Sequence, residues 1–163
     1  MTAVTARAID LPDEKATAAL ATDLAARARQ GDVIALSGPL GSGKTTFARH
    51  FIGARMGASP REKQEVPSPT FTLVETYQPP SGPAIWHFDL YRIETPEDAY
   101  ELGIEDAFAD GIALIEWPEH LGALMPREYL DIALGPGKSE NARIATLAPS
   151  PSWAARVVGL VHG

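Results

Sequence analysis

Apolar residues in this chain gather into short runs that predict strands. Residues 33–36 and 111–115 are continuous apolar runs, which is typical of parallel strands covered on both faces. Residues 5–9 predict a shorter strand at the N-terminus. The chain therefore favours a sheet whose central strands are buried.

Helices are predicted between these runs by a different spacing of apolar residues. A helix beginning near Pro12 and ending at Gly31 is indicated by small and apolar residues at four-residue spacing, namely Ala16, Leu20, Leu24 and Ala28. Residues 43–57 predict a second helix. Thr95 and Pro96 predict a third, with Thr95 as the N-cap and Pro96 as the first helical residue.

Two pairs of runs predict antiparallel strands. Residues 71–77 and 84–90 are joined by a connection too short for a helical crossover, so we expect them to pair antiparallel. Residues 129–134 and 142–147 predict a closing hairpin, and residues 152–161 a last helix. The predicted fold class is α/β: a mixed parallel and antiparallel sheet with helices on both faces.

Length and composition narrow the function classes. The chain has 163 residues, of which 45% are hydrophobic, so we expect a single domain over residues 1–163. Its formal charge of −7 is the wrong sign for gripping nucleic-acid phosphates directly. There is no cysteine, and no run approaches the roughly 18 apolar residues of a membrane span. We therefore expect a cytoplasmic protein with no membrane contact.

A phosphate-binding loop is the strongest motif. Residues 38–46 match G-x-x-x-x-G-K-[ST], after an apolar run and before a predicted helix. Glycines let backbone N–H groups and the helix N-terminus point at phosphates, Lys44 can reach the β- and γ-phosphates, and Thr45 can bind Mg²⁺. The motif predicts that the domain is a P-loop NTPase domain, with ATP and Mg²⁺ as its cofactors. The predicted nucleotide-binding residues are Gly38, Leu40, Gly41, Ser42, Gly43, Lys44, Thr45 and Thr46.

An acidic residue at a neighbouring strand end would complete such a site, and the chain offers two. Glu116 ends the more apolar run, so we predict that it is the metal partner, directly or through a water. Asp89 is then predicted to position the attacking water. Either could instead be a solvated acid at a strand end.

Two residues beside these carboxylates each allow two interpretations. His87 lies between Trp86 and Phe88, a setting that favours a structural histidine over a base. Trp117 follows Glu116 and fits equally well as core filler or as a coupling residue that faces a partner.

Several segments appear in the order of one known family. They are residues 11–14, 38–46, 68–75, 87–92, 101–104 and 116–119, which include SPTFTLVE, HFDLYR and EWPE. From about residue 11 to 121 the chain resembles the bacterial TsaE family, the ATPases of tRNA threonylcarbamoyladenosine biosynthesis. Beyond residue 121 the resemblance is only general.

The resemblance implies a Mg²⁺-dependent ATPase that works with TsaB and TsaD on the adenosine next to the anticodon. It implies that hydrolysis is slow without partners and resets the complex, and that tRNA is met through the complex. It also implies that Glu14 contacts the nucleotide, that Asp89 is needed for hydrolysis, and that Thr70 belongs to a switch-like loop with a part in catalysis. Pro39 and Ser42 depart from the family's usual residues, which affects only the fine nucleotide affinity.

Two other functions use the same loop. A small-molecule or nucleoside kinase would usually need an arginine-bearing lid, and Arg127, Arg143 and Arg156 are too widely spaced to predict one. A nucleotide-gated interaction module with negligible turnover is the other alternative.

Overall fold

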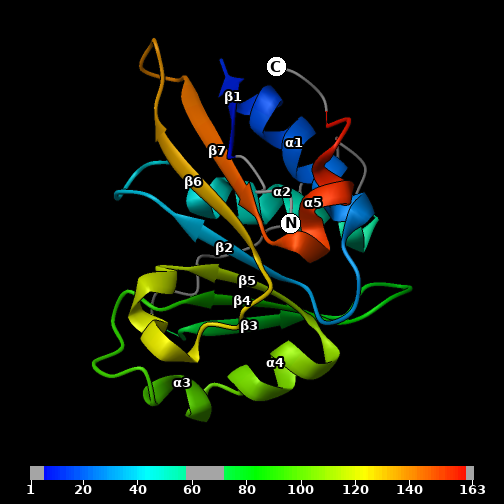
Figure 1. Cartoon of the computed structure of the whole chain (residues 1–163), viewed down its shortest axis with the longest axis vertical. Coiled ribbons are helices and arrows are strands. Elements are labelled where there is room, and N and C mark those ends of the chain that lie inside the picture. Colours follow the sequence, from blue (N-terminus) through cyan, green and yellow to red (C-terminus); the bar gives the residue numbers. More distant parts are fainter. Residues whose placement is uncertain (1–5, 58–71, 161–163) are drawn as a thin grey trace.

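The sheet that the pattern predicts is present as one seven-stranded layer (Figure 1). The computed structural model describes residues 6–57 and 72–160. Strand order is β1-β7-β6-β2-β5-β4-β3. The strands are β1 (Arg7–Leu11), β2 (Val33–Ser37), β3 (Val74–Tyr77), β4 (Ile85–Asp89), β5 (Ile112–Glu116), β6 (Leu130–Pro136) and β7 (Arg143–Pro149).

Strand direction changes across the sheet. β2 lies between β5 and β6 and is parallel to both, and β4 is parallel to β5. β3 pairs antiparallel with β4, and β7 pairs antiparallel with β6 and β1. Both predicted antiparallel pairings are confirmed, as is the mixed α/β class.

Helices cover both faces of the sheet, as predicted (Figure 1). They are α1 (Glu14–Arg27), α2 (Lys44–Met56), α3 (Asp98–Glu101), α4 (Ile104–Asp110), the 3₁₀ helix η1 (Pro118–Leu124) and α5 (Pro151–Val157). α1, α2 and α5 lie on one face, and α3, α4 and η1 on the other. Among the described residues, no helix has the length and apolar character needed to cross a membrane.

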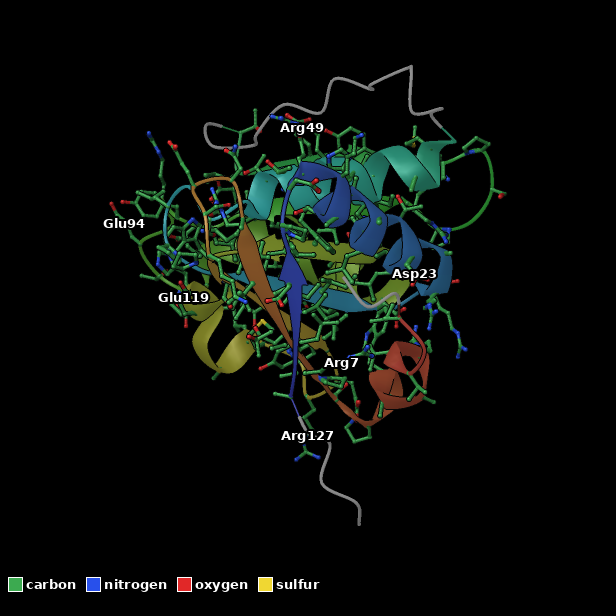
Figure 2. The ribbon with its side chains drawn as sticks, turned by 90° about the horizontal axis from the view of Figure 1, so that it is seen from above. Arg7, Asp23, Arg49, Glu94, Glu119 and Arg127 are labelled. Carbon is green, nitrogen blue, oxygen red and sulfur yellow. The ribbon has the colours of Figure 1, made fainter. Side chains whose placement is uncertain are left out.

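Successive residues of the central strands enter opposite halves of the core. Ile34 and Leu114 pack with α1 and α2, whereas Val33 and Ile115 pack with α4 and η1. All four are buried. Burial on both faces explains why these strands are apolar throughout instead of alternating. Charged side chains such as those of Glu94 and Arg127 lie at the periphery (Figure 2).

The end of the first helix was predicted wrongly. α1 is capped by Asp13, whose carboxylate accepts the backbone N–H of Ala16 at 2.9 Å, but it ends at Arg27 instead of near Gly31. Ala28 is already extended, and the Gly31 N–H donates to the Gly111 carbonyl at 2.7 Å. The chain therefore leaves the helix early, and Gly31 bonds to the residue that precedes β5.

Thr95 is not a helix N-cap, so that prediction is also wrong. α3 begins at Asp98, and the Asp98 carboxylate accepts the N–H groups of Glu94 and Thr95, each at 3.1 Å. The carboxylate of the first helical residue thus accepts hydrogen bonds from the turn that precedes the helix. Helices α4 and η1 were not predicted, since each is too short to show a periodic apolar stripe.

Other predicted boundaries are close to those observed. Gly43 and Gly57 cap α2 in left-handed conformations, which confirms the predicted helix over 43–57. β3 begins at Val74, after a turn in which Leu73 has φ 67°. Thr70 lies outside the described residues.

Candidate nucleotide site

The candidate site lies where three parallel neighbouring strands end. β2, β5 and β4 end at Ser37, Glu116 and Asp89, and Asp89 is the direct register partner of Glu116. Side chains two or four residues apart on a strand point to the same face of the sheet. Asp89 therefore shares a face with Ile85, and Glu116 with Leu114, and this is the face that packs against α2. In open α/β sheets, ligands bind in the crevice outside the carboxyl ends of the strands.

The loop after β2 is built from glycines in left-handed conformations. Gly38, Gly41 and Gly43 have φ values of 136°, 77° and 102°. At Gly38 an added Cβ would lie only 2.3 Å from the carbonyl oxygen of Leu134. Inside the loop, the Ser42 hydroxyl is buried without a partner among the described residues. Such a loop exposes backbone N–H groups and fits a phosphate.

Replacing Gly38 with alanine is expected to destabilise the protein by about 1–3 kcal/mol, because a side chain there is both strained and in collision with Leu134. A thermal melt should show a fall of about 2–4 °C for each kcal/mol lost.

The matched control is Gly53→Ala, inside α2, where an added Cβ meets nothing within 4 Å. This variant should melt at or above the wild-type temperature, because alanine favours a helix interior. Equal melting of Gly38→Ala and wild type would contradict the collision at the start of the loop.

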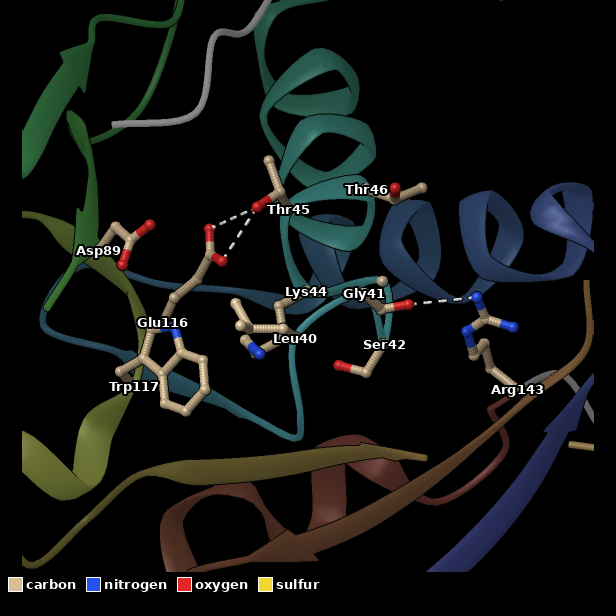
Figure 3. A pocket seen from close by; sticks show the side chains of 11 residues that line it. Leu40, Gly41, Ser42, Lys44, Thr45, Thr46, Asp89, Glu116, Trp117 and Arg143 are labelled. Carbon is tan, nitrogen blue, oxygen red and sulfur yellow. Dashed lines mark hydrogen bonds between the residues drawn. The ribbon is translucent and has the colours of Figure 1, made fainter. Parts of the chain in front are cut away.

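A cavity of about 310 Å³ lies between this loop and the strand ends (Figure 3). It is lined by Leu40, Gly41, Ser42, Gly43, Lys44, Thr45, Thr46, Asp89, Glu116, Trp117 and Arg143. The predicted loop residues, both predicted carboxylates and Trp117 are therefore brought together around one space. Gly38 does not line it, but its carbonyl accepts a hydrogen bond from Lys44.

Lys44 is held by the loop itself. Its Nζ donates to the carbonyls of Gly38 at 2.5 Å and Pro39 at 3.0 Å, and lies 4.1 Å from the centre of the Trp117 ring. Burial lowers the pKa of Lys44, while the carboxylates of Glu116, Glu119 and Asp89 act in the opposite direction. The ammonium group thus lies in a negative, partly dry pocket.

Trp117 matches neither of its two interpretations fully. It is half-buried and has φ 61°, and its ring centre lies 4.9 Å from that of Tyr91, which is 47% exposed. It packs on the edge of the core while its ring faces the Lys44 ammonium. Trp117 therefore connects the cavity wall with an exposed aromatic surface.

The carboxylates have different surroundings. Glu116 is 3% exposed and lies beside the Thr45 hydroxyl, with Oγ1 3.0 Å from Oε1 and 3.1 Å from Oε2. Asp89 is 6% exposed, and its Oδ1 accepts the Tyr91 N–H at 3.1 Å. Glu116 is therefore coupled to the helix that follows the loop, and Asp89 to the chain that follows β4.

The Thr45 and Glu116 oxygens fit a magnesium ion. Two oxygens that share an octahedral Mg²⁺ at 2.0–2.1 Å lie about 2.9 Å apart, close to the 3.0 Å found here. In the described parts of the chain, no group of three or more His, Asp or Glu could hold a metal by itself. The two oxygens would suit a magnesium ion that takes most of its ligands from phosphates and water.

A second cavity, of about 520 Å³, adjoins the first and shares Ser42, Gly43, Thr46 and Arg143 with it. Glu14 lines this second cavity, with its Oε1 3.4 Å from His50 Nε2. Together the cavities extend from the strand ends to the N-terminus of α1.

Arg143 is a site residue that the sequence did not reveal. It begins β7, and its Nη2 donates to the Gly41 carbonyl at 3.2 Å. Arg143 lies 102 residues after Gly41 in the sequence, and no motif links the two positions. The hairpin of β6 and β7 was predicted, but its position beside β2, which carries Arg143 to the loop, could not be predicted from local pattern.

The strand order and this loop define an α/β protein of the P-loop class. The family profile described as "Threonylcarbamoyl adenosine biosynthesis protein TsaE" matches residues 11–144, and the chain belongs to this family.

Relatives from distant bacteria support the assignment. The chain is 37% identical over 142 residues to the "tRNA threonylcarbamoyladenosine biosynthesis protein TsaE" of Rickettsia felis, covering 87% of this chain and 80% of that protein. It is 37% identical over 124 residues to the protein of that name from Bacillus subtilis, covering 76% and 72%. The crystal structure of Bacillus subtilis YdiB is similar with a TM-score of 0.74 and 26% identity, over 95% of this chain and 93% of that one.

Proposed function

We propose that the chain binds ATP with Mg²⁺ in the loop cavity and hydrolyses it, as a subunit of a tRNA-modifying complex. The observation that carries the proposal is the convergence of Lys44, Thr45 and Glu116 on one cavity beside the glycine loop. The names of the relatives supply the process, tRNA threonylcarbamoyladenosine biosynthesis.

The loop and α2 would hold the phosphates. Backbone N–H groups of the loop, together with the N-terminus of α2, bind anionic oxygens. Lys44 would exchange its bonds with the Gly38 and Pro39 carbonyls for bonds with the β- and γ-phosphates. Thr45 and Glu116 would hold Mg²⁺, which when bound neutralises negative charge on the phosphates.

Asp89 would act on the water. It lies on the same strand edge as Glu116, lines the cavity and is largely buried, so its carboxylate is protected from bulk solvent. From there it can orient a water for attack on the γ-phosphate and accept its proton.

The partners we propose are TsaB and TsaD. In this scheme the complex modifies the adenosine next to the anticodon, and hydrolysis on the present chain resets it between turnovers. The formal charge of −7 supports a subunit that meets tRNA through its partners and not by its own surface.

ATP turnover should rise severalfold when TsaB and TsaD are added together, because coupling requires their complex. The measurement is phosphate release by the chain alone, with each partner, and with both. A kinase would instead turn over with a small acceptor, and a nucleotide-gated module would turn over with neither. Unchanged turnover with both partners would contradict the coupled ATPase.

Trp117→Leu should lower modification of tRNA by the reconstituted complex about tenfold while ATP affinity changes less than tenfold, a limit of about 1.4 kcal/mol. The reason is that Trp117 links the cavity wall to the exposed Tyr91. Leucine keeps an apolar contact at this position.

The control is Tyr100→Leu, which removes an exposed aromatic side chain that lines neither cavity. Full modification activity in a folded Trp117→Leu protein would show that the residue has no part in coupling.

A further inference from the structure

His87 is buried completely on β4 and contacts Glu116. Its Nε2 lies 2.7 Å from Glu116 Oε2, and both side chains are nearly inaccessible, at 0% and 4%. His87 precedes Asp89 by two residues and therefore shares its face of the sheet. It does not line either cavity, so it acts on the site only through another residue.

The contact requires a hydrogen on Nε2. A carboxylate accepts hydrogen bonds, so Nε2 must donate to Glu116. The other ring nitrogen, Nδ1, is buried and has no partner among the described residues. A buried polar atom without a partner costs about 1–3 kcal/mol, which an apolar side chain at this position would avoid. Packing alone therefore does not account for a histidine here.

The two contacts of Glu116 fix its carboxylate from opposite elements. His87 on β4 bonds to Oε2, and Thr45 on α2 lies within hydrogen-bond distance of both oxygens. Without the histidine, the Thr45 hydroxyl, which is shared between both oxygens, would be the one contact among the described residues that still holds the carboxylate. The orientation of Glu116 toward Thr45 thus depends on the ring.

We propose that His87 is a positioning residue: its Nε2–H holds Glu116 in the orientation that receives Mg²⁺ together with Thr45. The inference rests on the proposed function, in which Glu116 faces the metal. A partner that orients a metal ligand in this way typically contributes 10–100-fold to metal affinity.

The experiment measures ATP affinity with Mg²⁺ and with the metal removed by EDTA, in wild type, His87→Gln, His87→Asn and His87→Leu. The amide nitrogen of glutamine occupies about the position of Nε2, whereas that of asparagine lies nearer the backbone and does not reach Glu116. Gln should keep the gain in affinity that Mg²⁺ gives, and Asn and Leu should lose at least about tenfold of it. Affinity in EDTA should be similar in all four proteins.

Each outcome separates this inference from the proposed function. A wild-type affinity that is equal with and without Mg²⁺ would overturn both. A wild-type gain that persists in His87→Asn or His87→Leu, or that is lost equally in His87→Gln, would overturn only the positioning role.

A measurement on the unmodified protein decides the matter if the variants fail to fold. The ¹⁵N chemical shifts of the His87 ring in the wild-type protein should show a hydrogen on Nε2. A ring with hydrogen on Nδ1 alone would overturn the inference, because Nε2 could not then donate to Glu116.

Discussion

Lys44→Ala is expected to reduce ATP hydrolysis by about 10²–10³-fold, the loss typical for one charge-stabilising donor in a catalytic site. Lys44 is the lysine whose ammonium group lies in the cavity, between the loop carbonyls and the Trp117 ring. No other loop side chain can supply positive charge to a γ-phosphate at that position. Phosphate release under saturating ATP, with the partner proteins present, is the measurement.

Lys138→Ala is the matched control, since Lys138 is exposed and lines neither cavity. Its turnover should equal that of wild type. Circular dichroism must show the same helix and strand content in both variants. A folded Lys44→Ala protein with wild-type turnover would exclude the loop as the catalytic site.

Asp89→Asn is expected to reduce hydrolysis by about 10²–10⁴-fold while Mg²⁺-ATP affinity stays within about tenfold of wild type. An amide can occupy the same space and accept the Tyr91 N–H, but it cannot take a proton from the attacking water. Single-turnover hydrolysis and equilibrium binding of Mg²⁺-ATP separate the two effects.

Glu116→Gln gives the reciprocal comparison. It should weaken Mg²⁺-ATP binding more than Asp89→Asn does, because Glu116 lies beside Thr45 whereas Asp89 bonds to the chain after β4. Identical Mg²⁺ titrations for the two variants would show that the two carboxylates do not divide the work in this way.

Local chemistry made much of the fold and site predictable. The conformation of residues 38–46 depends mainly on their own sequence, because Gly41 and Gly43 adopt left-handed conformations and α2 begins directly after Gly43. Glu116 could be selected because its run is apolar throughout, and β5 is buried along its whole length between β2 and β4. The roles of these residues in binding and hydrolysis stay predictions.

The features that the sequence did not reveal depend on contacts between distant segments. Arg143 reaches the loop only because the predicted hairpin lies next to β2, through the parallel pairing of β6 with β2. His87 could be placed on a strand, but its bond to Glu116 needs the register of β4 against β5. The early end of α1 depends similarly on the Gly111 carbonyl, which lies far along the chain. None of these has a signal within one element.

The contact between Gly38 and β6 has a consequence for how this protein tolerates change. The atom that would meet a side chain at position 38 is the main-chain oxygen of Leu134, and no rearrangement of side chains can move it aside. That oxygen is present whatever residue stands at position 134, so a change of side chain there cannot relieve the collision. A substitution at Gly38 therefore cannot be compensated by exchanging side chains in the β6–β7 hairpin, and the start of the loop depends on glycine at this one position.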